Sequence, residues 1–297
     1  MKLLDALAER QLVVVTGKGG VGKTTLAAAI GRLLAAGGRK TLLLEIDPRE
    51  SLHQLLGTDP SGGHILKAGE RLAAQNLQPK DVMEGLVREK VPIRALARKI
   101  VASPVFQHFV EGAPGLKEMA VLGYALRMVE GAYRHKADVV VLDAPATGHG
   151  ASMLAAPLML ADAIGGGQLG DMAKDLAAFI ADPTRCGVVL ATLAEEMPVQ
   201  EAIELVALLR ERMGRPPELV IANALYPPFP REAAARGRGD QVDVLSLWRE
   251  RRRVNERELK RLQGSWKGPL AELPLVPLER GPALLAALEV ELGGELQ

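Results

Sequence analysis

Short apolar runs recur along the chain between segments in which apolar positions follow helical spacing. Five runs rich in Val, Ile and Leu occupy residues 12–16, 41–46, 138–143, 187–192 and 218–223. Because they are apolar at odd and even positions alike, they are typical of parallel strands buried on both faces by helices. A sixth run, residues 272–277, contains prolines and is therefore expected at a strand end or in a loop. The pattern predicts an α/β fold, a doubly wound and mostly parallel sheet flanked by helices.

The spacing of these runs is uneven. Roughly ninety residues separate the second run from the third, whereas a simple strand–helix–strand crossover needs about thirty. We therefore predict a single domain over residues 1–297, with helical inserts at residues 51–137 and 151–182. A Gly-Gly-Gly break at residues 165–167 divides the second insert. The charged segment 231–266, in which arginines alternate with glutamates, is expected to be a solvated helix.

Composition narrows the function classes. The 37 Lys and Arg residues nearly cancel the 36 Asp and Glu residues, which leaves no overall field to hold nucleic acid or an anionic membrane. Cys186 is the one cysteine, so an intramolecular disulfide and a thiolate zinc site are excluded, and a reducing cytoplasm is the expected compartment. The longest uncharged stretch, residues 144–161, contains glycine, histidine and proline and is a poor membrane span. We expect no integral membrane segment and no nucleic-acid partner.

Residues 16–25, TGKGGVGKTT, carry the most specific motif. The pattern Gly17-x4-Gly22-Lys23-Thr24 fits a phosphate-binding loop, and it lies between a predicted strand and a predicted helix, as that loop requires. The loop residues expected to surround the phosphates of a nucleotide are Gly17, Gly19, Gly20, Val21, Gly22, Lys23, Thr24 and Thr25. Lys23 would hold the β and γ phosphates, and the Thr24 hydroxyl would ligate Mg²⁺.

Two aspartates end predicted strands beside this loop. Asp143 follows four apolar residues, and from there it can orient Mg²⁺ through a water molecule. Asp47 ends the second run, where Pro48 keeps it extended, and a carboxylate there can aim a water molecule at the γ-phosphate. Each position is also typical of a helix cap or turn residue, although Ser51 is the better-placed cap near Asp47.

The motifs GKGGVGKTT, DPRES and DAPATGHG, in this order and spacing, resemble the arsenite-pump and tail-anchored-protein-targeting ATPases. These belong to the larger group of deviant phosphate-loop ATPases that includes the division-site and plasmid-partition ATPases. Further similarity at residues 190–202, 220–227 and 273–288 extends the resemblance over nearly the whole chain. The resemblance implies an ATPase that uses ATP and Mg²⁺, dimerises on ATP and couples hydrolysis to conformational change for transport or membrane-protein targeting.

The resemblance also implies roles for single residues. Lys18 would reach across a dimer interface to the phosphates of the partner subunit, where it stabilises charge as an arginine finger does elsewhere. Asp47 would be the water-orienting residue of the first switch, and Asp143 would begin the second. The remaining implied positions are Thr147, Gly148 and His149 in the second switch, and Asn223, Pro274 and Pro277 around the adenine. The order Asp-Ala-Pro-Ala-Thr at residues 143–147 departs from the family's Asp-Thr-Ala-Pro-Thr, which predicts different loop dynamics.

The departures leave the cellular role open. Neither the zinc-bridging cysteine pair of targeting relatives nor the cysteines of the arsenite pump are present. A single half needs a second copy or a paralogous ATPase, so a homodimer or a heterodimer is expected, with a membrane-protein partner or a hydrophobic client. The alternatives are a positioning ATPase that assembles on a membrane or on DNA, for which the arginines of residues 249–261 are the candidate DNA contacts, and the regulatory half of a heterodimer. The inserts contain methionines that read as core or as a client groove: Met83, Met119, Met128, Met153, Met159 and Met172.

Overall fold

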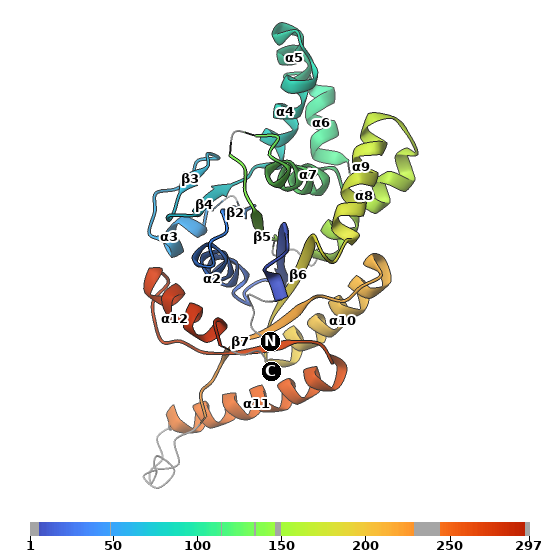
Figure 1. The fold of residues 1–297 in the computed structure, drawn as a ribbon. Coiled ribbons are helices and arrows are strands. Elements are labelled where there is room, and N and C mark those ends of the chain that lie inside the picture. Colours follow the sequence, from blue (N-terminus) through green and yellow to red (C-terminus); the bar gives the residue numbers. More distant parts are fainter. Residues whose placement is uncertain are drawn as a thin grey trace.

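The computed structural model describes residues 6–47, 49–113, 115–133, 135–145, 150–228 and 244–294 (Figure 1). Its centre is an 8-stranded sheet in the order β3-β4-β2-β5-β1-β6-β7-β8. The strands are β1 Leu12–Gly17, β2 Thr41–Glu45, β3 Leu66–Lys67, β4 Leu72–Asn76, β5 Val139–Asp143, β6 Cys186–Leu193, β7 Leu219–Leu225 and β8 Leu270–Pro274. All neighbours pair in parallel except β3 and β4. The predicted α/β fold is confirmed.

The two edges of the sheet compare differently with the sequence prediction. The sixth run lies at a strand end, as expected, because β8 begins at Leu270 and ends at Pro274, the first proline of the run. The segment 51–137, expected to be helical, also contributes the β3–β4 hairpin. Its strand β4 reads LAAQN and holds no β-branched or aromatic residue. Strand propensity was therefore too weak to reveal it, and pairing with β2 decides its conformation.

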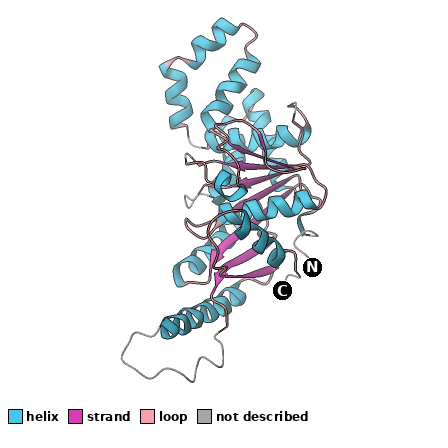
Figure 2. Ribbon diagram, turned by 90° about the vertical axis from the view of Figure 1, so that its left-hand side faces the viewer, coloured by secondary structure: helices cyan, strands magenta, loops and turns pink. Residues whose placement is uncertain are grey.

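Helices cover both faces of the sheet (Figures 1 and 2). One face carries α2 Lys23–Ala36, α3 Leu52–Leu56 and α12 Pro282–Leu292. The other carries α7 Leu116–Glu130, α8 Gly150–Ile164, α9 Gly167–Ala181 and α10 Glu196–Met213. Helices α4 Pro79–Lys90, α5 Arg94–Val101 and α6 Pro104–Gly112 project beyond α7 at the top of Figure 1. Helices α8 and α9 make up most of residues 151–182 and meet at the glycine break.

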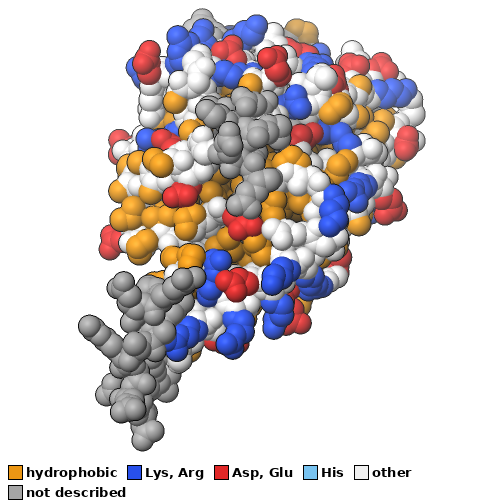
Figure 3. All heavy atoms as spheres, turned by 60° about the horizontal axis from the view of Figure 1, so that its bottom comes forward, with side chains coloured by type: hydrophobic (Ala, Val, Ile, Leu, Met, Phe, Trp, Pro, Cys, Tyr) orange, Lys and Arg blue, Asp and Glu red, His pale blue; other side chains and the backbone are white. Residues whose placement is uncertain are grey.

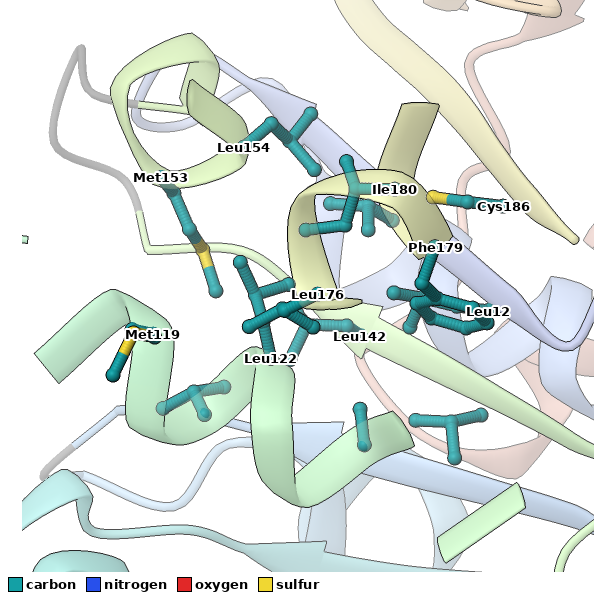
Figure 4. Close-up of a cluster of buried hydrophobic side chains, with 14 of the residues drawn as sticks. Leu12, Met119, Leu122, Leu142, Met153, Leu154, Leu176, Phe179, Ile180 and Cys186 are labelled. Atoms are coloured by element: carbon teal, nitrogen blue, oxygen red, sulfur yellow. The ribbon is translucent and has the colours of Figure 1, made fainter. Parts of the chain in front are cut away.

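Side chains along β1 point alternately to the two faces of the sheet, and each face has its own hydrophobic core. Leu12 and Val14 pack with the α7–α10 layer, whereas Val13 and Val15 pack with α2, α3 and α12. Figure 4 shows the first core, where Met119 and Met153 lie among leucines. Both are almost fully buried, as is Met128, so these three methionines serve as core. Burial raises the pKa of the Cys186 thiol, also in this core, to about 12, which leaves the thiol protonated and unreactive.

The described part of the charged segment contains α11, Val244–Ser265, which packs against α10. Its arginines pair with glutamates, as Arg252 does with Glu256 at 2.8 Å and Arg261 with Glu258 at 3.3 Å. Figure 3 shows Lys and Arg side chains interspersed with Asp and Glu on this side of the molecule. Residues 244–265 nevertheless carry seven Lys and Arg against three Glu, so the ion pairs neutralise only part of the positive charge along α11. Among the described residues, the helices are too short or too polar to cross a membrane.

Candidate functional site

The loop after β1 turns sharply before α2 begins at Lys23. Gly17, Gly20 and Gly22 have φ angles of +144°, +83° and +90°, a region that residues with a Cβ rarely adopt. A Cβ on Gly17 would overlap the carbonyl oxygen of Ala191, and one on Gly22 would overlap the Asn223 amide. Glycine is therefore required at both positions. The predicted loop forms at the amino end of a 14-residue helix, where backbone N–H groups and the helix dipole favour an anion.

Lys23 lies inside the loop. Its side chain is nearly buried, and its ammonium donates a hydrogen bond to the carbonyl oxygen of Lys18 at 2.9 Å. Burial lowers the pKa of Lys23 below its ordinary value, and the Asp143 carboxylate partly offsets this. A buried cation with one carbonyl partner has donors left for phosphate oxygens. The role of Lys23 as the phosphate lysine stays a prediction, and its burial inside the loop is compatible with that role.

Lys18 points the other way. Its side chain is 43% exposed, and its ammonium pairs with the carboxylate of Glu201 on α10. A hollow of about 500 Å³ lies beside this pair, lined by residues 17–19 and by α10. The second oxygen of Glu201 is buried without a hydrogen-bond partner in the described part of the chain. The Lys18 ammonium therefore points away from its own loop and contacts Glu201, a residue that sequence reasoning had not connected with Lys18.

Asp143 and Thr24 meet beneath the loop. The Thr24 hydroxyl donates a hydrogen bond to one Asp143 oxygen at 2.6 Å, and the other oxygen is buried without a partner among the described residues. Burial raises the pKa of Asp143 from 3.8 to about 7; Thr24 and Lys23 oppose the shift, and the carboxylates of Glu45 and Asp47 add to it. An uncompensated carboxylate beside a hydroxyl fits a divalent cation.

Magnesium suits this donor set. The described residues hold no cluster of three or more His, Cys, Asp or Glu side chains that would bind a metal alone. Mg²⁺ is usually held by one or two protein oxygens together with water and phosphate oxygens, so such a cluster is not needed. Thr24 and Asp143 are the residues that would hold it, directly and through water respectively.

Asp47 forms a turn at the end of β2. One of its carboxylate oxygens accepts a hydrogen bond from the Arg49 amide at 2.8 Å, and its carbonyl oxygen accepts one from the Asn76 side chain. The turn places the carboxylate close enough to Asp143 to raise the pKa of that residue. The other Asp47 oxygen makes no hydrogen bond within the described residues, which leaves it available to a water molecule.

Glu45 was missed by sequence reasoning because it lies inside the apolar run TLLLE. Its buried carboxylate accepts hydrogen bonds from the amides of Ser51 and Leu52, at 2.7 Å and 3.1 Å. It therefore caps α3, a role that the sequence had assigned to the Ser51 side chain, which makes no capping hydrogen bond. Burial raises the pKa of Glu45, and the two amide hydrogen bonds oppose that shift. Glu45 thus anchors the segment that carries Asp47.

The remaining predicted site residues are those around the adenine and those of the second switch. The Asn223 side chain donates a hydrogen bond to the Val21 carbonyl at 2.9 Å, which ties the end of β7 to the loop. Ala224 follows with φ +55°, where the register of β7 and β8 shifts. Pro274 ends β8, and Pro277 lies in the segment that follows it. Residues 147–149, predicted as the second switch, lie outside the described residues, so that prediction stays untested.

A second cavity, of about 300 Å³, lies within the helical layer. Its lining is almost entirely apolar and comes mainly from α4, α7 and the start of α9. Met83, Met119 and Met172 contribute to it. Large apolar side chains are also exposed on this layer: Ile93, Leu96, Val105, Leu158, Met159 and Ile164. The methionines of the inserts therefore differ in position: Met119 belongs to both the core and the cavity wall, and Met159 is exposed.

Comparison with known proteins agrees with this geometry. A model of the anion-transporting ATPase family matches residues 10–174, which include the loop, Asp47 and Asp143. The chain is 31% identical over 249 residues to ATPase BagA of Mycobacterium tuberculosis, covering 80% of this chain and 72% of that protein. It is 29% identical to the arsenical pump-driving ATPase of Escherichia coli over 80% of this chain and 39% of the relative. ATPase ASNA1 homolog 2 of Paramecium tetraurelia is 27% identical over 49% of this chain and 43% of its own length.

Proposed function

The chain belongs to the anion-transporting ATPase family and hydrolyses ATP, and on this premise we propose that it works as a dimer with shared active sites. In this dimer, Lys18 of each protomer contacts the phosphates that the other protomer holds. Closing and opening of the dimer would move the helical layer of α4–α9.

The main support for the shared-site dimer is that Lys18 and Lys23 point in opposite directions. Lys23 is nearly buried inside the loop, whereas Lys18 extends outward to Glu201. An exposed ion pair of this kind contributes about 1 kcal/mol or less. Phosphate groups bearing several negative charges can therefore compete for the Lys18 ammonium, and the adjoining hollow gives the side chain room to turn.

The residues of the site divide the work of hydrolysis. Lys23 and the loop amides hold the β and γ phosphates, and Lys18 of the partner neutralises charge as the γ-phosphoryl group departs. Thr24 and Asp143 would hold Mg²⁺, which would neutralise phosphate charge when bound. Asp47 accepts a hydrogen bond from the attacking water and so aims it. Asn223, whose amide already contacts Val21, would hold the adenine with the loop around Pro274 and Pro277.

The apolar cavity and the exposed apolar side chains favour a hydrophobic client or a membrane-protein partner for the helical layer. Both lie on α4–α9, away from the nucleotide loop. Methionine side chains adapt to different apolar shapes, which suits a surface that must accept more than one sequence. The alternative of a DNA-bound positioning ATPase would use the arginines of α11, of which Arg252 and Arg261 already pair with glutamates of the same helix.

Dimerisation is tested by measuring molecular mass in solution with Mg²⁺ and a nonhydrolysable ATP analogue, and again without nucleotide. We expect a dimer only with the analogue, and a specific turnover that rises with enzyme concentration. A monomer in both conditions, with turnover independent of concentration, would refute the proposal. Absence of turnover by the protein alone, restored by a paralogous ATPase, would instead identify a regulatory half.

The client proposal needs a separate assay. Binding of a fluorescent apolar helical peptide is measured with the nonhydrolysable analogue and without nucleotide. We expect binding only with the analogue, and a substitution of Met172, in the cavity wall, by Glu should weaken it. Equal binding in both nucleotide conditions would refute coupling between the two sites.

A further inference from the structure

A cavity of about 560 Å³ opens at the amino ends of β2 and β4, beside the segment that leads into β5. The nucleotide loop, Asp47 and Asp143 lie at the opposite, carboxyl edge of the sheet. Because β2 spans Thr41–Glu45 and a strand rises about 3.3 Å per residue, its two ends lie roughly 13 Å apart. The cavity is therefore separate from the ATP site, and it is also separate from the apolar cavity of the helical layer.

The rim of this cavity is cationic. Lys40, Lys67, Arg71 and Lys136 lie around it, and all four are exposed. Glu70 is the one carboxylate in the lining, which leaves an excess of three positive charges. Among the described residues, none of these four cations has an ion-pair partner, in contrast with the arginines of α11. Unpaired like charges around one hollow repel each other, and a bound anion would relieve that repulsion.

The floor is apolar. Leu42, Leu72, Met128 and Ala137 are buried at the bottom of the cavity, and Ile65 packs beside them. Three of the four buried residues belong to the core that lies under α7–α9. An inorganic anion alone would leave this floor in contact with water, whereas an organic anion would cover it.

The backbone around the cavity is fixed. The amides of Ala68 and Gly69 both donate to the Leu72 carbonyl, at 2.8 Å and 3.0 Å, which closes the β3–β4 turn. The Thr41 amide donates to the Arg71 carbonyl at 2.8 Å and joins that turn to β2. Lys67 and Arg71 are therefore held on a rigid turn, so that less conformational entropy is lost when a ligand binds.

We propose that this cavity binds an amphipathic anion, with an apolar tail on the floor and a carboxylate or phosphate head between Lys67, Arg71 and Lys136. The volume lies within the range of about 300–1,000 Å³ that is usual for small-ligand pockets. Such chemistry occurs in free medium-chain acyl anions and in acidic lipid head groups with their first methylenes. The proposal does not depend on the dimer or on ATP turnover.

Calorimetric titration of the full chain with octanoate and with octyl phosphate tests the site. ADP and Mg²⁺ are kept at saturation so that phosphate groups do not bind the nucleotide loop. We expect both probes to bind at least about tenfold more tightly than acetate and inorganic phosphate, because the tail covers the apolar floor. Equal affinity with and without the tail would overturn the proposal.

Charge-reversal variants locate the binding. Lys67→Glu/Arg71→Glu should weaken both probes by about tenfold or more, and more so at low salt than at high salt. The matched control is Lys117→Glu/Lys260→Glu, two exposed cations outside the cavity, which should retain wild-type affinity. Exposed positions tolerate such changes, and unchanged thermal melting confirms folding. Equal affinities for the two double variants would overturn the assignment.

Vesicle flotation then distinguishes the two sources of the anion. Flotation with vesicles of phosphatidylglycerol in phosphatidylcholine that is lost in Lys67→Glu/Arg71→Glu assigns a lipid head group. Binding of octyl phosphate without flotation assigns a free ligand. Binding of neither would refute the site.

Discussion

Replacement of Asp143 by Asn tests the electrostatics beneath the phosphate loop in the protein without metal or nucleotide. Burial raises the pKa of this carboxyl from 3.8 to about 7, so the folded protein favours the neutral acid. The neutral state is reached without cost only below the ordinary pKa. Below pH 3.8 the carboxyl is neutral in both the folded and the unfolded protein, so Asp143 does not lower the free energy of unfolding. As the pH rises from 3.8 through about 7, the unfolded protein releases this proton first, and the free energy of unfolding falls.

The size of the effect follows from the shift. Each pKa unit corresponds to about 1.4 kcal/mol, so a shift of about three units sets a ceiling near 4 kcal/mol. Asn is neutral at every pH and can still accept the hydrogen bond from Thr24. The variant should therefore match the wild type at about pH 4 and exceed its free energy of unfolding by up to about 4 kcal/mol at pH 8.

Urea unfolding in EDTA, at a series of pH values between about pH 4 and pH 8, provides the measurement. Subtracting the free energy of unfolding of the wild type from that of the variant removes the contributions of the other titrating groups. The control is Asp171→Asn, at an exposed position of α9, for which this difference should stay near zero. Addition of Mg²⁺ and ADP should stabilise the wild type more than the Asp143 variant. A difference that stays constant over the whole pH range would refute the reasoning.

Two other substitutions test neighbouring parts of the site. Glu201→Gln removes the partner of Lys18, so it should change the free energy of unfolding by less than about 1 kcal/mol and raise steady-state turnover by up to about fivefold; a fall in turnover would show that the pair assists catalysis. Gly17→Ala should cost more than about 2 kcal/mol in urea unfolding, because the new methyl overlaps the Ala191 carbonyl at a φ of +144°. Gly85→Ala, within α4 and with open space around it, is the control and should stabilise by up to about 1 kcal/mol.

Local patterns in the sequence were sufficient for most of the fold. Runs of consecutive apolar residues identified β1, β2, β5, β6 and β7, because a strand buried on both faces has no polar positions. The phosphate loop was also predictable. Its backbone needs positive φ angles that glycine adopts readily, and this requirement is visible within a few residues of sequence. The β3–β4 hairpin was not, since its conformation depends on pairing with β2 rather than on its own composition.

Contacts between distant segments account for what sequence reasoning missed at the site. Lys18 and Glu201 are 183 positions apart, and Asn223 and Val21 are 202 positions apart. No local pattern records such pairs, although Glu201 lies within the 190–202 segment that carried part of the family resemblance. The capping role of Glu45 was missed for another reason. Glu45 lies within an apolar strand sequence, which gives no sign that its carboxylate accepts a hydrogen bond from the Ser51 amide.

The central claim is that Lys18 serves the nucleotide of the other protomer, and mixing two impaired variants tests it directly. Lys18→Ala keeps an intact pocket but lacks the crossing lysine, whereas Asp47→Ala keeps that lysine but lacks the oxygen that accepts a hydrogen bond from the water. In an equal mixture half of the dimers are mixed, and each mixed dimer has one complete site, so turnover should return to about one quarter of wild type. Turnover no greater than the mean of the two variants measured alone, or a Lys18→Ala protein with normal turnover, would contradict the account.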